Sequence, residues 1–207
     1  MSSSNLIRWS GLSALVGGAL MIVSDVINAV LFPGEQSSQV MLTGSWLTIQ
    51  ILGLVALALI TLGLVGMYAC QVQQAGTLGL IAFVMTFGGM LMVFGLLWGE
   101  PFLGPLVAEQ APGLLSAEPS GALAVGSIFS IVLFAMGWLL FGLASLRAGM
   151  LPRGAAALLI VGALLSFVLT LLNLPLFSVV LGAALIWTGY ALWSGTGEPA
   201  LVAEAAR

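Results

Sequence analysis

Five acid and amide side chains lie in or beside the apolar segments of this sequence, and their types are the ones that could bind a ligand. Asp25 and Asn28 lie one helical turn apart, Gln50 and Glu100 lie near the ends of two other apolar segments, and Asn173 separates two more. Asp25 is the only formal charge well inside an apolar segment. Acids and amides placed in this way bind cations or polar ligand groups, or they hydrogen-bond to neighbouring helices.

The composition excludes most catalytic chemistry. The chain has no histidine and no lysine, and its single cysteine is Cys70. Without histidine there is no imidazole metal ligand and no His-activated nucleophile, and without lysine there is no Schiff base. A single cysteine excludes an internal disulfide and a CxxC pair. We therefore expect a protein that is not an enzyme, with no catalytic residue, no metal site and no cofactor.

Asp25 is too deep in its segment to reach the membrane surface. It lies seven residues before Phe32, which is about 10 Å at helical rise. An unpaired carboxylate at mid-bilayer costs about 2.5–3.5 kcal/mol on insertion scales. The side chain should therefore face other helices and be protonated, hydrogen-bonded or hydrated.

Two interpretations of the polar residues stay open at this point. In the first, Asp25 and Asn28 hydrogen-bond across helices to Gln50 or Asn173 and fix the packing. In the second, these side chains and Glu100 line an outward-facing polar pocket that binds a small or amphipathic ligand or a cation. A continuous polar pathway across the membrane is disfavoured, because the inner halves of the segments carry only Thr, Ser, Tyr and Cys70 as polar side chains.

The elements that must position these residues are long apolar segments. The chain is 61% hydrophobic and 5% charged, whereas a soluble domain carries about 25% charged residues. A membrane-spanning helix needs about 20 apolar residues. The sequence therefore predicts one all-α, multi-pass membrane domain over residues 1–207, a bundle of six transmembrane helices. The predicted spans cover residues 9–32, 46–70, 77–98, 121–146, 154–172 and 174–193.

The connections between these segments are also predicted. Residues 71–76, with three glutamines, form a short inner loop, and residues 34–45 and 99–120 form longer outer loops. Pro175 breaks the last apolar stretch into a tight hairpin, because proline removes a helix hydrogen bond.

Small residues form stripes along three of the segments. Helix association in lipid relies on close contact at small residues, so the stripes predict packing seams. Each stripe leads to a polar group at the same end of the bundle, namely Asp25 with Asn28, Glu100, or Asn173. The stripe residues are Gly11, Ala14 and Gly18 in the first segment, Gly79 and Gly89 in the third, and Gly162 in the fifth.

Charge distribution predicts the orientation. All four arginines, Arg8, Arg147, Arg153 and Arg207, fall on one side of the predicted bundle. The positive-inside rule then places both termini in the cytoplasm. With a net charge of −3 and four arginines, nothing resembles a nucleic-acid footprint, so we expect no nucleic-acid partner.

An internal repeat is also visible. Gly17-Gly18-Ala19-Leu20-Met21 recurs as Gly88-Gly89-Met90-Leu91-Met92, and in weaker form as Val161-Gly162-Ala163-Leu164-Leu165. This pattern predicts three helical hairpins in the same orientation. It disfavours the transporter folds that are built on inverted repeats.

The opening Leu6-Ile7-Arg8-Trp9-Ser10-Gly11 and the Leu62–Tyr68 run Leu-Gly-Leu-Val-Gly-Met-Tyr resemble uncharacterised six-span bacterial membrane proteins, a resemblance that implies no activity. The architecture is also similar to the substrate-binding subunits of energy-coupling-factor vitamin importers, by analogy alone.

We therefore expect a protein of the bacterial cytoplasmic membrane that is a small-molecule or lipid-binding component, or a transport component. Membrane lipid is the expected partner, with other membrane subunits or a second copy of the chain as further partners. The alternative class is a structural or assembly subunit that packs against partner helices.

Overall fold

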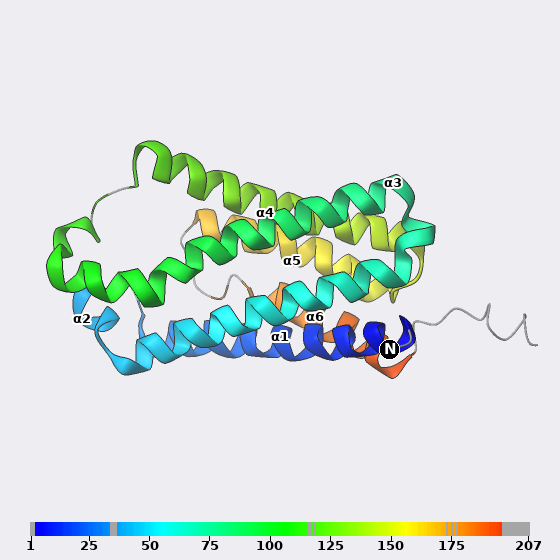
Figure 1. The fold of residues 1–207 in the computed structure, drawn as a ribbon, viewed down its shortest axis with the longest axis horizontal. Coiled ribbons are helices and arrows are strands. Elements are labelled where there is room, and N and C mark those ends of the chain that lie inside the picture. The colour runs from blue at the N-terminus through cyan, green and yellow to red at the C-terminus, as the bar shows by residue number, and fades with distance from the viewer. Residues whose placement is uncertain are drawn as a thin grey trace, which may run out of the picture.

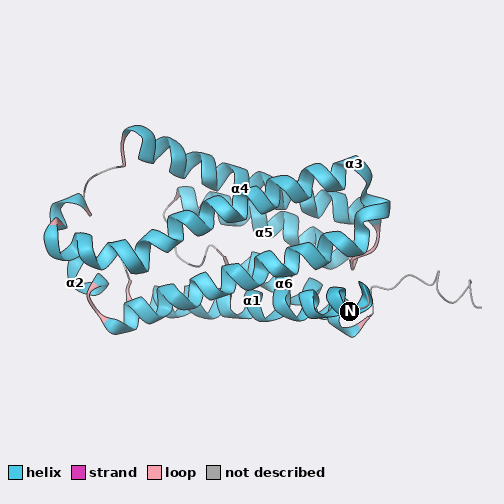
Figure 2. Cartoon of the chain, viewed as in Figure 1, coloured by secondary structure: helices cyan, strands magenta, loops and turns pink. Residues whose placement is uncertain are grey.

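The protein is a bundle of long helices that lie side by side (Figures 1 and 2). The computed structural model describes residues 3–33, 37–115, 117, 119–172, 174, 176 and 178–195, and these residues contain no strand. The predicted all-helical fold is therefore confirmed for this part of the chain. The helices are α1 (Ser3–Leu31), α2 (Ser38–Met41), α3 (Gly44–Gln110), α4 (Gly121–Ala148), α5 (Arg153–Leu171) and α6 (Val179–Ser194), with a short 3₁₀ turn η1 (Pro112–Leu114) after α3.

Four of these helices, α1, α3, α4 and α5, are long and apolar enough to cross a membrane, and α6 is a shorter apolar helix. Many large aliphatic and aromatic side chains are exposed on the outside of the bundle. An apolar exterior of this extent suits a lipid environment, in which water is absent and backbone polar groups must be satisfied within each helix.

Helix α3 is a hairpin of two arms rather than one rod. Gly76 has φ 56° and ψ −150° inside an otherwise helical stretch of 67 residues. This backbone region is accessible almost only to glycine. Figure 1 shows the cyan and green arms of α3 running back past each other from a turn at the right. The glycine at this position therefore sets the point at which the chain reverses.

Two predicted connections differ from the structure. Residues 71–76 were expected to form a loop, but the helix continues through Gln71, Gln73 and Gln74, and only Gly76 leaves helical geometry. A single glycine is enough to reverse the chain, so the glutamines remain free to continue the helix.

The predicted outer loop 99–120 is wrong over its first half, because α3 continues to Gln110 through Pro101 and Pro105. Each proline removes one backbone donor, and apolar neighbours such as Trp98 and Phe102, whose rings lie 5.0 Å apart, hold the remaining turns together. The break expected near the end of the chain is present, since α5 ends at Leu171 and α6 begins at Val179. Asn173 and Pro175 themselves lie outside the described residues.

The helices form a closed ring in which each packs on the next. The first arm of α3 packs on α1, the second arm packs on α4, α4 packs on α5, α5 packs on α6, and α6 returns to α1. The interior is filled by fully buried side chains, including Trp138, Phe141, Leu64, Met67 and Leu185. The two arms of α3 are joined near the turn by the stacked rings of Tyr68 and Phe83, whose centroids lie 4.4 Å apart.

The two ends of the ring differ in their polar residues. Arg8 lies near the start of α1, Arg147 lies in the last turn of α4 and Arg153 begins α5. The Arg8 Nε donates a hydrogen bond of 3.3 Å to the Trp193 carbonyl near the end of α6. We call this the arginine end. The N mark and the turn between the two arms of α3 both lie at the right of Figure 1. Asp25, Gln50 and Glu100 lie toward the opposite end of their helices.

Candidate functional site

Asp25 connects α1 to the start of α6. Its Oδ2 accepts hydrogen bonds from the Ser178 backbone N–H at 3.2 Å and from the Ser178 hydroxyl at 2.9 Å. Ser178 is the residue immediately before α6, where the first backbone N–H groups have no partner within the helix. A carboxylate at this position also interacts favourably with the positive end of the helix dipole. Asp25 therefore supplies, from another helix, the acceptor that α6 lacks.

Asn28 lies one turn further along the same face of α1. Its Oδ1 is buried and has no hydrogen-bond partner among the described residues. Asn173, which was expected to lie nearby, falls outside the described residues. Asn28 is thus an acceptor close to Asp25 that the helices themselves do not satisfy.

Gln50 and Glu100 form a second polar contact, between the two arms of α3. The Gln50 Nε2 donates a hydrogen bond to the Glu100 carboxylate. One turn further out, the fully buried ring of Trp46 faces Gly104, and a Cβ added at Gly104 would lie 3.3 Å from the Trp46 ring. The indole N–H of Trp46 has no partner within the described part of the chain. This contact fastens the open end of the α3 hairpin.

Two separate hydrogen-bonded pairs therefore involve the predicted polar residues that the structure describes. Asp25 bonds to α6, and Gln50 bonds to Glu100. No hydrogen bond joins one pair to the other among the residues that the structure describes. Each pair instead connects two helical segments that are distant in sequence.

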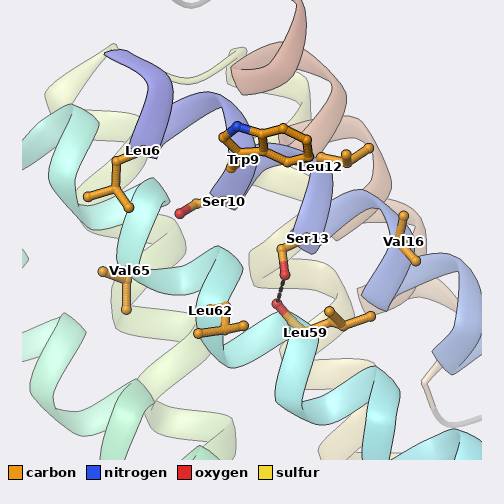
Figure 3. Close-up of a pocket in the computed structure, with 9 residues that line it drawn as sticks. All are labelled: Leu6, Trp9, Ser10, Leu12, Ser13, Val16, Leu59, Leu62 and Val65. Atoms are coloured by element: carbon orange, nitrogen blue, oxygen red, sulfur yellow. Dashed lines mark hydrogen bonds between the residues drawn. The ribbon is translucent and has the colours of Figure 1, made fainter. Parts of the chain in front are cut away.

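A groove lies at the other end of the molecule, between α1 and the first arm of α3. Its volume is about 470 Å³. Figure 3 shows side chains from both helices around it, with the Ser13 hydroxyl turned toward the Leu59 carbonyl, to which it donates a hydrogen bond of 2.8 Å. The groove is lined by Leu6, Trp9, Ser10, Leu12, Ser13, Val16, Leu59, Leu62 and Val65.

The lining of this groove is almost entirely apolar in character. The Ser13 hydroxyl is already bonded, and Ser10 is largely buried, where its Cβ lies 2.2 Å from the position that a Cβ at Gly66 would take. Trp9, in contrast, is 63% exposed and stands at the rim. The groove can therefore hold a hydrocarbon chain, and it offers no acid or base to react with it. None of the predicted polar site residues lines it.

The six predicted packing residues lie at the following contacts. A Cβ at Gly11 would lie 2.7 Å from Leu192 Cβ, and one at Gly18 would lie 2.7 Å from the Gly182 carbonyl oxygen, both on α6. The Ala14 Cβ lies 2.6 Å from the Cβ position of Gly63 on α3. These contacts bring α1 against its two neighbours at backbone distance.

The remaining three packing residues lie on α3 and α5. A Cβ at Gly89 would lie 2.6 Å from Phe134 Cα on α4, and one at Gly162 would lie 2.7 Å from Leu181 Cα on α6. Gly79 differs, because its nearest neighbour is Ala75 Cβ of the same helix, at 2.3 Å across the Gly76 turn. Gly79 therefore leaves space for the turn within α3 and does not form a contact with another helix.

Three residues that matter in the structure carried little signal in the sequence. Ser178 precedes an apolar segment, which is a typical position for a helix cap, but its partner on α1 depends on the register between distant helices. Ser13 and Trp9 line the groove, yet alone each reads as an ordinary residue of a membrane helix.

The described residues contain no group of three or more metal-ligating side chains. Comparison of the chain with protein-family models, with curated proteins and with solved structures gives no match.

Proposed function

We propose that this chain is a non-enzymatic, six-span protein of the bacterial inner membrane that binds the hydrocarbon part of a lipid or another amphipathic molecule. The observation that supports this proposal best is the groove between α1 and α3. Its volume of about 470 Å³ falls within the roughly 300–1,000 Å³ of typical small-molecule sites. Its apolar walls favour a hydrocarbon chain over a polar or charged ligand.

The six-span topology rests on the two arms of α3. From Gly44 to the Gly76 turn, the first arm is about 48 Å long, and from the turn to Gln110 the second is about 51 Å long, at 1.5 Å per residue. Each arm exceeds the roughly 30 Å of a bilayer hydrocarbon core. With one span for each of α1, α4, α5 and α6, the chain would cross the membrane six times.

The position of the groove suits an amphipathic ligand. It lies in the first half of α1, near the arginine end, where the exposed Trp9 stands at its rim. Tryptophan prefers the interface between hydrocarbon and headgroups. A ligand with its chain in the groove would therefore have its polar end at the membrane surface beside Trp9.

A groove-filling substitution tests the proposal. Leu62→Trp enlarges an exposed side chain in the groove wall, and Leu80→Trp enlarges an exposed side chain on the same helix but outside the groove. We expect native mass spectrometry of the gently extracted protein to show a retained amphipathic adduct for the wild type and for Leu80→Trp. Leu62→Trp should lower the occupied fraction at least several-fold.

Equal adduct occupancy in all three proteins would contradict a ligand site in the groove. Loss of the adduct from both variants would also count against it, because the effect would then come from general disturbance of α3.

An outward-facing polar pocket around Asp25, Asn28, Gln50, Glu100 and Asn173 stays a prediction. The proposed hydrocarbon site in the groove does not depend on this pocket. In the structure, the Asp25 and Glu100 carboxylates bond to Ser178 and Gln50.

A second candidate function is that of a structural or assembly subunit. It is supported by an uncovered glycine on the second arm of α3, since a Cβ at Gly95 would meet no atom within 4 Å and the neighbouring Leu91 and Met92 are exposed. Small residues of this kind permit close association of membrane helices. The same mass spectrum separates the two functions, since a partner chain or second copy would appear as a mass far larger than that of a lipid.

A further inference from the structure

Gln71 is a polar side chain placed where the helices give it no partner. It lies on the first arm of α3, near the arginine end, and is fully buried. Neither its Oε1 nor its Nε2 has a hydrogen-bond partner among the described residues. A glutamine amide carries two donors and an acceptor, and buried groups of this type are nearly always bonded in folded proteins.

Ser145, near the end of α4, has the same property. It is fully buried, and its Oγ has no partner in the described part of the chain. A buried hydroxyl in a helix usually bonds to the carbonyl four residues earlier. Thr86 and Thr188 do so here, at 2.6 Å and 2.7 Å respectively. The unbonded hydroxyl of Ser145 therefore differs from the hydroxyls of Thr86 and Thr188.

The level of Gln71 in the bundle follows from the aromatic stack between the arms of α3. Tyr68 stacks on Phe83 with a centroid distance of 4.4 Å. Because the arms run in opposite directions, Gln71, three residues after Tyr68, lies at the level of Leu80, three residues before Phe83.

The level of Ser145 follows from the contact between α3 and α4. A Cβ at Gly137 would lie 2.6 Å from Thr86 Cα. Ser145 is eight residues after Gly137, so it lies at the level of Leu78, eight residues before Thr86. Leu78 and Leu80 differ by about 3 Å along a helix axis. The two unbonded side chains thus share one level inside the ring.

We propose that Gln71 and Ser145 form an internal binding site for a neutral hydrogen-bonding molecule of the size of water, held between α3 and α4 at the arginine end. Such a molecule would accept from the Gln71 amide or donate to its oxygen, and would bond to the Ser145 hydroxyl at the same time. A water molecule bound inside a protein typically makes about three such bonds. No charged group is required, so the site would select a neutral ligand.

A double-mutant cycle tests this site with water itself as the ligand. The variants are Gln71→Leu, Ser145→Ala and the double variant, and Thr86→Val is the control because its hydroxyl is bonded within its own helix. We expect each single substitution at the site to lower the Tm of the detergent-solubilised protein by about 2–4 °C. The double variant should lose less than the sum, whereas Gln71→Leu and Thr86→Val should add.

Unchanged or higher Tm values in the single variants would overturn the proposal, because removal of dry, unbonded polar groups relieves a cost. Strict additivity between Gln71→Leu and Ser145→Ala would overturn it as well, since two independent groups share no ligand.

If a variant fails to fold, a high-resolution structure of the wild type in lipid tests the proposed site instead. The proposal expects ordered density within about 3.2 Å of both the Ser145 Oγ and a Gln71 amide atom. A continuous apolar contact between α3 and α4 at this level, without such density, would overturn it.

Discussion

At the scale of single residues, the acids on α1 and α3 act as hydrogen-bond acceptors between segments of the chain. Asp25 accepts hydrogen bonds from both the backbone and the side chain of Ser178, which lies 153 positions later, immediately before α6. Glu100 accepts from Gln50 on the other arm of its own helix. Each carboxylate stabilises the fold only when the two segments are aligned so that its hydrogen-bond partner lies opposite it.

Removal of the Asp25 carboxyl should therefore destabilise the protein. Asp25→Ala leaves the Ser178 N–H and hydroxyl without their acceptor, and we expect a loss of about 1–3 kcal/mol in the free energy of unfolding. Asp25→Asn keeps one oxygen acceptor and should lose less. Thermal unfolding of the purified variants measures the difference. The capping role would be wrong if Asp25→Ala were as stable as the wild type.

The sequence predicts part of this arrangement. The cost of a lone carboxylate in hydrocarbon requires Asp25 to face other helices, and that argument needs only the length of its segment. The partner could not be predicted, because Ser178 meets Asp25 through the register between α1 and α6. Gln50, one of the partners considered, bonds instead to Glu100.

At the scale of elements, glycines determine how closely neighbouring helices approach. The backbones of α3 and α4 meet where Gly89 faces Phe134 and where Gly137 faces Thr86. Dispersion forces between such closely packed backbones replace the hydrophobic effect, which gives little to helix association inside lipid.

A matched pair of substitutions on α3 tests this role. Gly89→Ala adds a Cβ that would lie 2.6 Å from Phe134 Cα, whereas Gly95→Ala adds one that meets no atom within 4 Å. We expect Gly89→Ala to cost about 1–3 kcal/mol through overpacking. Gly95→Ala should be neutral or slightly stabilising, because alanine favours helix over glycine. Equal unfolding temperatures for the two variants would contradict the packing role.

The errors in the predicted helix ends have a clear physical origin. Three glutamines between residues 71 and 74 and a glycine at 76 resemble a loop, but the reversal needs only the unusual backbone angles of Gly76. Pro101 and Pro105 resemble the start of a loop, yet α3 absorbs both. Apolar periodicity locates helices well, whereas the residue at which a helix ends depends on contacts that a single sequence does not contain.

At the scale of the whole molecule, the ring has one end with arginines and one end with acids. Under the proposed topology the arginine end faces the cytoplasm, as the positive-inside rule requires. The Arg8 bond to the Trp193 carbonyl holds the start of α1 beside the end of α6 at that side.

The single cysteine makes this orientation straightforward to test. In a Cys70→Ser background, Glu109→Cys and Gln74→Cys each place one thiol at an exposed position, on opposite arms of α3. We expect a membrane-impermeant maleimide to label Glu109→Cys in cells with a permeable outer envelope and an intact inner membrane. Gln74→Cys should react only after permeabilisation. Reaction of Gln74→Cys alone in intact cells would reverse the proposed orientation.

Helix α6 is unusual in its length. Its 16 residues extend about 24 Å at helical rise, several ångströms less than a typical hydrocarbon core. Because Asp25 closes the start of α6 within the bundle, the polar beginning of this helix is drawn below the level at which α1 ends. Under the proposed six-span topology, the bilayer beside α6 would have to thin to match it, and a membrane with shorter acyl chains would accommodate the protein with less distortion. With that topology, hydrophobic mismatch at one helix would give the whole molecule a preference for thin bilayers.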